Sequence, residues 1–220
     1  MLDIVKGKLI VSCQALSNEP LHSSFIMGRM AKAAKEGGAV AIRAQGVEDI
    51  VEIKNMTSLP IIGIIKKEYS DSEIYITPTK KEIDELLKTR CEMIAIDATN
   101  RKRPNNESLE ELVNYIKQNN VLVMADISTY EEAIEAQKIG CDCVSTTLCG
   151  YTPYSENYDG PNLELIKILS EKLHIPVIAE GKINTPEEAI HGKERDYINV
   201  IALSGSAPLA QNIEIVDAYL

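Results

Sequence analysis

Ionisable side chains end five of the short apolar segments of this sequence. They are Arg43, Lys66, Asp97, Asp126 and Glu180. An ionisable group at the end of a buried strand loses favourable hydration, and this cost must be offset by a charged or hydrogen-bonding partner or accepted for a function. Because five segments share this feature, we predict that these side chains meet in one cleft, where perturbed charges are typical of functional sites. The alternative is a ring of salt bridges that closes the mouth of the sheet.

Lys66 is the strongest candidate for acid–base chemistry. It follows the apolar residues 60–65, and partial desolvation there would lower the pKa of its ammonium group from about 10.4. Such a lysine can act as a general base, a general acid or a Schiff-base nucleophile. Lys67 should point the other way, because side chains alternate along a strand. Glu180 could pair with Lys66, and the two groups together would suit proton abstraction beside a carbonyl group.

Other strand ends would supply contacts to a substrate. Arg43 and Gln14 could bind a carbonyl or enolate oxygen, and Asp126 could orient a sugar hydroxyl. Asp97 and Asp126 could instead hold a metal ion. Two carboxylates without a histidine at matching spacing offer too few ligands for a typical divalent site, so we predict no metal.

Two small-residue turns are candidates for binding phosphate. They follow the seventh and eighth apolar segments and contain Gly181-Lys182 and Gly205-Ser206. In parallel barrels the loops at these two places commonly bind phosphate through backbone N–H groups. Glycine lets the backbone approach a ligand closely. We therefore predict that Gly181, Lys182, Gly205 and Ser206 bind phosphate.

The segments that carry these residues alternate with helical patterns along the chain. Eight apolar segments lie at residues 8–14, 39–45, 60–66, 93–99, 121–127, 143–150, 176–181 and 200–206. Each is short and mostly apolar, which is typical of a buried strand. Helical patterns lie at residues 25–36, 80–88, 109–119, 130–139, 163–173 and 187–190, and Ser108 and Thr129 each begin a capping-box pattern.

Strict alternation of strands and helices predicts a parallel sheet, and eight units predict a closed (β/α)8 TIM barrel of the α/β class. No Gly-x-Gly-x-x-Gly follows the first strand, which disfavours a dinucleotide-binding fold. Since no linker or low-complexity stretch interrupts the pattern, residues 1–220 are expected to form a single domain.

Composition limits the partners and the compartment. The formal net charge of −10 disfavours nucleic acid as a partner, but it does not exclude a small phosphorylated substrate. No apolar run approaches a membrane span, and residues 1–14 contain no long apolar leader region. Five cysteines, an odd number, fit a reducing compartment and are expected to be small buried residues. We therefore expect a cytoplasmic protein with no membrane partner.

The strand-end motifs resemble those of the N-acetylmannosamine-6-phosphate 2-epimerase family. The resemblance covers roughly residues 1–190 and lies in residues 11–16 (VSCQAL), 41–46 (AIRAQG), 62–66 (IGIIK), 97–99 (DAT), 124–127 (MADI), 146–152 (TTLCGYT) and 178–183 (IAEGKI). It is specific, because the motifs occur in order at the ends of predicted strands.

This resemblance implies a barrel of the ribulose-phosphate-binding type and an isomerase of carbohydrate metabolism. The implied reaction interconverts N-acetylmannosamine 6-phosphate and N-acetylglucosamine 6-phosphate at C2, during the degradation of sialic acid and other amino sugars. Lys66 would be the principal catalytic residue, supported by Glu180, and no cofactor would be needed. The residues expected around the substrate are Gln14, Arg43, Asp126, Thr147 and Tyr151. A homodimer is a further expectation.

The sequence departs from this family after about residue 190, so the last repeat is atypical. Gly205, Ser206 and Ala207 match the last phosphate loop of the family, but Pro208 and Leu209 follow where an arginine is expected. We therefore expect phosphate to bind less tightly than in relatives with the full loop. Two alternative functions remain, namely a Schiff-base aldolase that uses Lys66 and a barrel that binds a sugar phosphate without catalysis.

Overall fold

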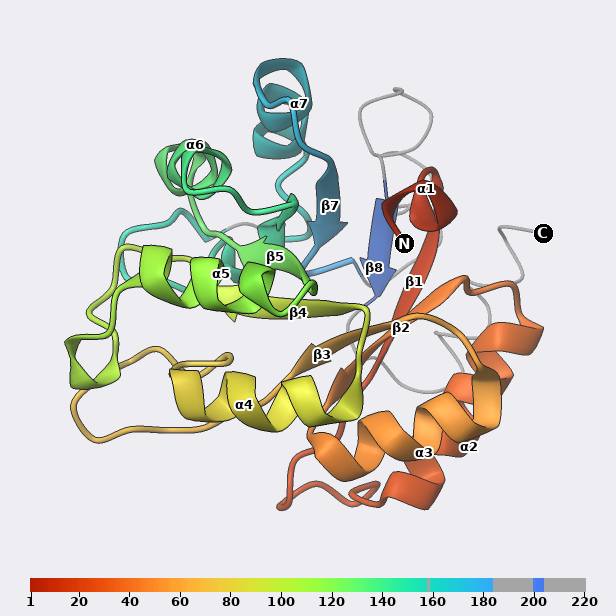
Figure 1. Cartoon of the computed structure of the whole chain (residues 1–220). Coiled ribbons are helices and arrows are strands. Elements are labelled where there is room, and N and C mark those ends of the chain that lie inside the picture. The colour runs from red at the N-terminus through yellow and green to blue at the C-terminus, as the bar shows by residue number, and fades with distance from the viewer. Residues whose placement is uncertain (158, 184–199, 204–220) are drawn as a thin grey trace.

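The computed structural model describes residues 1–157, 159–183 and 200–203. Eight parallel strands follow one another around a closed barrel, and β8 pairs with β1 to complete it (Figure 1). The strands are β1 (Lys8–Cys13), β2 (Ala41–Gln45), β3 (Ile61–Ile64), β4 (Met93–Asp97), β5 (Leu122–Asp126), β6 (Cys143–Ser145), β7 (Val177–Glu180) and β8 (Val200–Leu203). The predicted (β/α)8 barrel is therefore confirmed.

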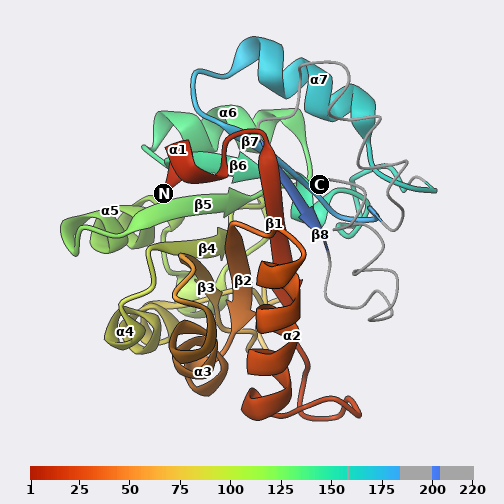
Figure 2. The same ribbon diagram turned by 90° about the vertical axis from the view of Figure 1, so that its right-hand side faces the viewer.

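The helices lie on the outside of the strands, as the turned view shows (Figure 2), except the first, whose Val5 packs with the apolar residues inside the barrel. They are α1 (Leu2–Val5), α2 (Ser24–Glu36), α3 (Val47–Thr57), α4 (Lys80–Thr89), α5 (Leu109–Gln118), α6 (Tyr130–Lys138) and α7 (Leu163–Lys172), with short 3-10 helices η1 (Pro104–Asn106) and η2 (Thr146–Leu148). In the described part of the chain, no helix has the length and apolar character needed to cross a membrane.

Most predicted elements are confirmed, with differences at their ends. The third strand ends at Ile64 and not at Lys66, and the sixth ends at Ser145 because the chain turns into η2. Helices α1 and α3 were not predicted, and the helix predicted at residues 187–190 lies outside the described residues. The capping box at Thr129 forms in full, whereas at Ser108 only the side chain caps the helix.

Side-chain alternation divides the strands into two apolar layers. One set of buried residues packs with the helices, and it includes Val11, Ile42, Ile94, Ala125 and Val144. The other set fills the barrel, and it includes Ile10, Ala41, Ile62, Ile64, Met93, Met124, Cys143 and Ile178. Continuing the inner set by two residues at the C-terminal ends of β1 to β7 gives polar residues, namely Ser12, Arg43, Lys66, Asp97, Asp126, Ser145 and Glu180. The barrel interior is thus apolar toward the N-terminal ends of the strands and polar at the mouth, where the strands end.

All five cysteines are buried and free, as the sequence predicts. Burial raises the pKa of the Cys13 and Cys141 thiols to about 12, with a smaller contribution from a nearby aspartate in each case. Cys143 lies inside the barrel, where burial raises its pKa well above the ordinary value. These thiols therefore stay protonated and act as small apolar core residues.

Gly63 lets β3 pack closely against α3 and α4. A Cβ atom at this position would lie 3.0 Å from Cys91 Sγ and 3.1 Å from both Ile50 Cδ1 and Leu86 Cδ2. Because such overpacking strains a dense core, we expect Gly63→Ala to lower the free energy of unfolding by about 1–3 kcal/mol. Urea denaturation measures this change. The double variant Gly63→Ala/Cys91→Ala should lose less free energy of unfolding than the two single variants lose together, because the smaller side chain at residue 91 makes room for the added methyl group. Strictly additive losses would contradict this explanation.

Candidate active site

A pocket opens at the C-terminal ends of the strands, inside the mouth of the barrel. Its lining residues are Ser12, Gln14, Arg43, Ile64, Lys66, Tyr75, Ile76, Thr147, Leu148, Tyr151, Glu180, Gly181 and Lys182. The structure thus brings together eight of the residues chosen from the sequence. Asp126 is fully buried beside Arg43, while Gly205 and Ser206 lie outside the described residues.

The guanidinium group of Arg43 is the central charge of this site. Arg43 Nη2 lies 2.5 Å from Asp126 Oδ2, and Arg43 Nη1 lies 3.1 Å from Asp126 Oδ1. Nη1 also lies 3.0 Å from Glu180 Oε2, so one arginine joins β2 to β5 and β7. Burial alone would lower the pKa of Arg43, but the two carboxylates raise it and keep the group charged. Within the described structure, Arg43 Nε is buried without a hydrogen-bond partner.

Two hydroxyl groups complete the network around Glu180. Thr147 Oγ1 lies 2.9 Å from Asp126 Oδ1 and 3.0 Å from Glu180 Oε2. Ser145 Oγ donates to the same Glu180 oxygen at 3.2 Å. Burial raises the pKa of Glu180, and the charge of Arg43 opposes this rise. Arg43, Asp126 and Glu180 thus form a buried network of salt bridges inside the mouth of the barrel.

Lys66 remains outside this network although it lines the same pocket. Among the described residues, its Nζ atom has no hydrogen-bond or ion-pair partner. Burial lowers the pKa of Lys66, and the positive charge of Arg43 lowers it further, while Glu180 raises it in part. Glu180 pairs with Arg43, so the expected Lys66–Glu180 pair is not present in this structure. A partly buried amine of this kind suits proton transfer.

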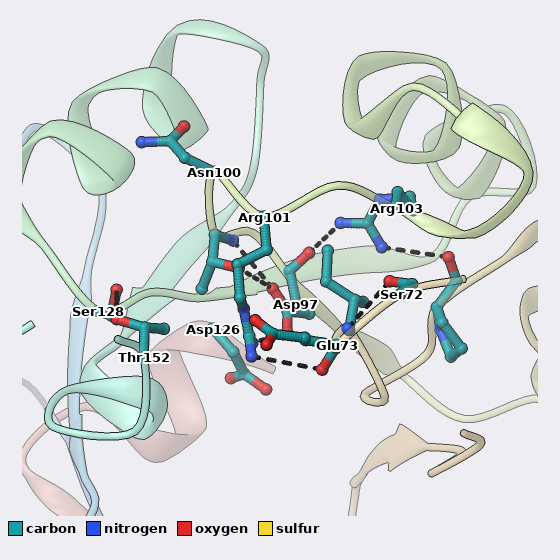
Figure 3. Close-up of polar contacts among 12 residues, drawn as sticks. Ser72, Glu73, Asp97, Asn100, Arg101, Arg103, Asp126, Ser128 and Thr152 are labelled. Carbon is teal, nitrogen blue, oxygen red and sulfur yellow. Dashed lines mark hydrogen bonds and ion pairs between the residues drawn. The ribbon is translucent and has the colours of Figure 1, made fainter. Parts of the chain in front are cut away.

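Asp97 does not join the pocket, which corrects the prediction that all five charges meet there. Its carboxylate lies 2.6 Å from Arg101 Nη2 and accepts a hydrogen bond from Thr99 Oγ1 at 2.7 Å (Figure 3). Arg103 donates to its backbone carbonyl oxygen. Burial raises the pKa of Asp97, and its bonds to Thr99 and the charge of Arg101 oppose the rise. The described residues contain no group of three or more histidine, cysteine or acidic residues placed to hold a metal ion.

Five lining residues were not singled out from the sequence. They are Ser12, Ile64, Tyr75, Ile76 and Leu148. Ser12 lies two residues before Gln14 on β1, and its hydroxyl accepts a hydrogen bond from the Gln14 amide, so side-chain alternation could have indicated it. Tyr75 and Ile76 belong to the strand-like residues 74–77 (IYIT), a signal that was available but unused.

The predicted phosphate-binding residues of the seventh loop lie at the edge of the pocket. Gly181 has a φ angle of +96°, and a Cβ atom there would lie 3.3 Å from the carbonyl oxygens of Thr146 and Thr147. Glycine is therefore required on both conformational and steric grounds. The Lys182 ammonium lies 5.5 Å from the centroid of the Tyr151 ring and donates to the Asn157 side chain. The loop thus presents a positive charge beside Tyr151.

Comparison with known proteins relates this site to one family. The family model described as "Putative N-acetylmannosamine-6-phosphate epimerase" matches residues 27–220. A relative from Clostridioides difficile with the corresponding 2-epimerase name is 73% identical over 188 residues, which cover 86% of this chain and 84% of the relative. A relative of the same name from Caldanaerobacter subterraneus is 54% identical over 205 residues, covering 91% and 86% of the two chains.

Solved structures give the same result. The N-acetylmannosamine-6-phosphate 2-epimerase from Clostridium perfringens superposes with a TM-score of 0.92 at 63% identity, over 96% of this chain and 92% of that one. A thiamine phosphate pyrophosphorylase from Pyrococcus furiosus has a TM-score of 0.61 at 18% identity, over 96% and 93% of the chains, and shows the fold alone.

The buried charge network predicts a large loss of stability when one partner is neutralised. We expect Asp126→Asn to lower the free energy of unfolding by about 3–5 kcal/mol, because Arg43 would keep a buried charge with one carboxylate fewer. Chemical denaturation is the measurement. Glu135→Gln removes the exposed pair with Lys138 and should change stability by less than about 1 kcal/mol. Equal effects of the two substitutions would contradict the prediction.

Proposed function

The chain belongs to the N-acetylmannosamine-6-phosphate epimerase family, and on this premise we propose that its pocket interconverts N-acetylmannosamine 6-phosphate and N-acetylglucosamine 6-phosphate. It is an isomerase of amino-sugar metabolism, which would act in the degradation of sialic acid. The observation that carries the proposed mechanism is the position of Lys66, whose amine lines the pocket next to a separate buried ion network.

The two sugars differ only in configuration at C2, so the reaction must break and re-form the C2–H bond. In the open-chain form the C1 carbonyl acidifies this hydrogen. Neutral Lys66 removes the proton, and the electron pair moves from the C2–H bond through C2–C1 to the carbonyl oxygen, giving an enolate. A water molecule, or another group that exchanges protons with solvent, then delivers a proton to the opposite face of C2, which restores the carbonyl and inverts the centre, and Lys66 releases its extra proton to solvent. The lowered pKa of Lys66 favours the neutral amine that begins this sequence.

Hydrogen-bond donors on β2 and directly after β1 would stabilise the enolate oxygen. Gln14 and Arg43 line the pocket, and the Nε atom of Arg43 has no partner in the ion network. A fixed donor in a partly buried site stabilises developing negative charge without reorganisation. Asp126 and Glu180 would hold Arg43 in place. Glu180 and Thr147, which line the pocket and bond to each other, would offer acceptor oxygens to sugar hydroxyls.

The phosphate group would bind at the seventh loop, through the Gly181 backbone and Lys182, together with Gly205 and Ser206. The support for the first two is their place in the pocket and the positive φ of Gly181. Tyr151 would pack beside the same end of the substrate.

We also propose that the protein binds no nucleic acid and lies in the cytoplasm. The net charge of −10 supports the absence of nucleic-acid binding, and the metabolic role supports a cytoplasmic location. A homodimer and a single domain over residues 1–220 are proposed as well. The epimerase is favoured over an aldolase or a non-catalytic barrel by the identity of the relatives. Borohydride trapping with substrate separates the aldolase, because proton transfer leaves no covalent adduct on Lys66.

Replacement of Lys66 tests the proposed base. Lys66→Ala should lower kcat about 10²–10⁴-fold while the circular dichroism spectrum stays unchanged, because general base catalysis contributes a factor of this size. A coupled assay for N-acetylglucosamine 6-phosphate gives the rate. In the unaltered enzyme kcat/KM should rise with pH as Lys66 loses its proton, with a midpoint below 10.5. Lys67→Ala is the matched control, because the side chain of Lys67 is exposed and does not line the pocket. Near-normal activity of Lys66→Ala would exclude Lys66 as the catalytic base.

Turnover in deuterium oxide tests the chemical step. The proton taken from C2 enters a lysine amine that exchanges with solvent, so the product should carry deuterium at C2. Proton NMR and mass spectrometry of the isolated sugar phosphate measure the incorporation. A product that keeps only protium at C2 after high conversion would speak against exchange during the reaction.

A further inference from the structure

The loop between β3 and α4 supplies an extra piece of the barrel mouth. Strands β3 and β4 pair at only two positions, Ile62↔Met93 and Gly63↔Ile94, so their C-terminal ends diverge. Residues 74–77 fill this gap, because Ile76 forms an antiparallel bridge with Lys66 and accepts a hydrogen bond from Asp97 N at 3.1 Å. These residues will be called the inserted segment.

Contacts to the neighbouring loop hold the inserted segment from outside (Figure 3). Arg101 Nη1 donates to the Glu73 carbonyl oxygen at 3.3 Å, and Arg101 is itself fixed by its ion pair with Asp97. Arg103 Nη1 donates to the Pro78 carbonyl oxygen at 3.2 Å, and Ser72 Oγ donates to Lys102 O at 2.7 Å. The segment is therefore anchored at both ends, and its side chains have defined positions.

The inserted segment brings Tyr75 and Ile76 into the wall of the pocket that contains Lys66. Among the described residues, the Tyr75 hydroxyl has no hydrogen-bond partner. By contrast, the hydroxyl groups of Tyr69 and Tyr154 donate to Glu82 at 2.9 Å and to Glu132 at 2.6 Å. Burial, followed by the charges of Asp126 and Asp97, raises the pKa of Tyr75, so its phenol remains a neutral donor. Ile76 and Ile64 add an apolar surface beside this donor.

The topology of the barrel shows which part of a substrate would face this wall. In a ring of eight strands, the β3–β4 gap lies opposite β7 and β8, where the phosphate is proposed to bind. Lys66 follows β3 and is proposed to act on C2. The substrate groups nearest the inserted segment are therefore those at the end of the sugar that lies farthest from the phosphate. These groups are the C1 oxygen, for which Gln14 and Arg43 provide donors on β1 and β2, and the acetamido group on C2.

We propose that Tyr75 and Ile76 form the subsite that binds the acetamido group. The Tyr75 hydroxyl donates a hydrogen bond to the amide carbonyl oxygen, and the acetyl methyl packs against Ile76 and Ile64. An amide needs this combination of one donor and an apolar surface. The proposal rests on the proposed epimerase function and assigns to these residues the preference for an N-acetylated sugar.

Binding of two inert acyclic ligands tests this assignment. The ligands are 2-acetamido-2-deoxyglucitol 6-phosphate and glucitol 6-phosphate, which differ only at C2 and cannot be epimerised because they lack the carbonyl group. Tyr75→Phe should weaken the acetamido ligand about tenfold, as expected for one neutral hydrogen bond in a partly buried site, and should change the binding of glucitol 6-phosphate less than twofold. Calorimetric titration gives both dissociation constants.

Tyr69→Phe is the matched control, because Tyr69 belongs to the same loop but its hydroxyl bonds to Glu82 and does not line the pocket. It should leave both dissociation constants within twofold of the original values. If Tyr75→Phe weakens the binding of both ligands equally, or of neither, the assignment of the acetamido subsite is overturned. Normal epimerase turnover would in that case leave the proposed function intact. Absence of turnover in the unaltered protein would instead reject the proposed function, and the assignment with it.

Discussion

The ion pairs of Arg43 determine how a polar active site can exist inside an apolar barrel. One guanidinium bridges Asp126 on β5 and Glu180 on β7, and all three side chains are nearly inaccessible to solvent. Removing three charges from water costs several kcal/mol per ion, and Coulombic attraction and hydrogen bonds must offset this cost. Apolar residues of similar volume often stabilise such a position as well or better. Stability alone therefore does not account for these buried charges.

This network also sets the electrostatic environment of Lys66. Arg43 lowers the pKa of Lys66, whereas Glu180 and Asp126 raise it, so burial decides the net direction. If Glu180 formed a direct ion pair with Lys66, it would stabilise the ammonium form and weaken the base. The pairing of Glu180 with Arg43 avoids this effect. The separation of the network from the lysine thus leaves its amine unpaired among the described residues, as the proposed proton transfer requires.

The sequence allowed the barrel and most pocket residues to be predicted, because both follow from local periodicity. Gln14, Arg43 and Glu180 were predicted because each comes at the end of a short apolar segment, and side-chain alternation in the barrel directs them into the mouth. Pairing partners could not be predicted in the same way, since Arg43, Asp126 and Glu180 come from strands that are not neighbours. Tyr75 was missed because its segment enters the barrel only through the divergence of β3 and β4. Residues 184–199 and 204–220 lie outside the described part of the chain, so the last phosphate loop stays a prediction.

Asp97 and Asp126 show why residue type and register alone do not define a role. The two lie side by side in the β4–β5 ladder and both point inward, so as bare carboxylates they would repel each other or attract a cation. Each has its own arginine instead. Arg101, four residues along the chain, pairs with Asp97 and also donates to the Glu73 carbonyl oxygen next to the inserted segment, while Arg43, from across the barrel, pairs with Asp126. The two arginines therefore convert one acidic pair into an anchor for the wall that carries Tyr75 and a support for the charge beside Lys66.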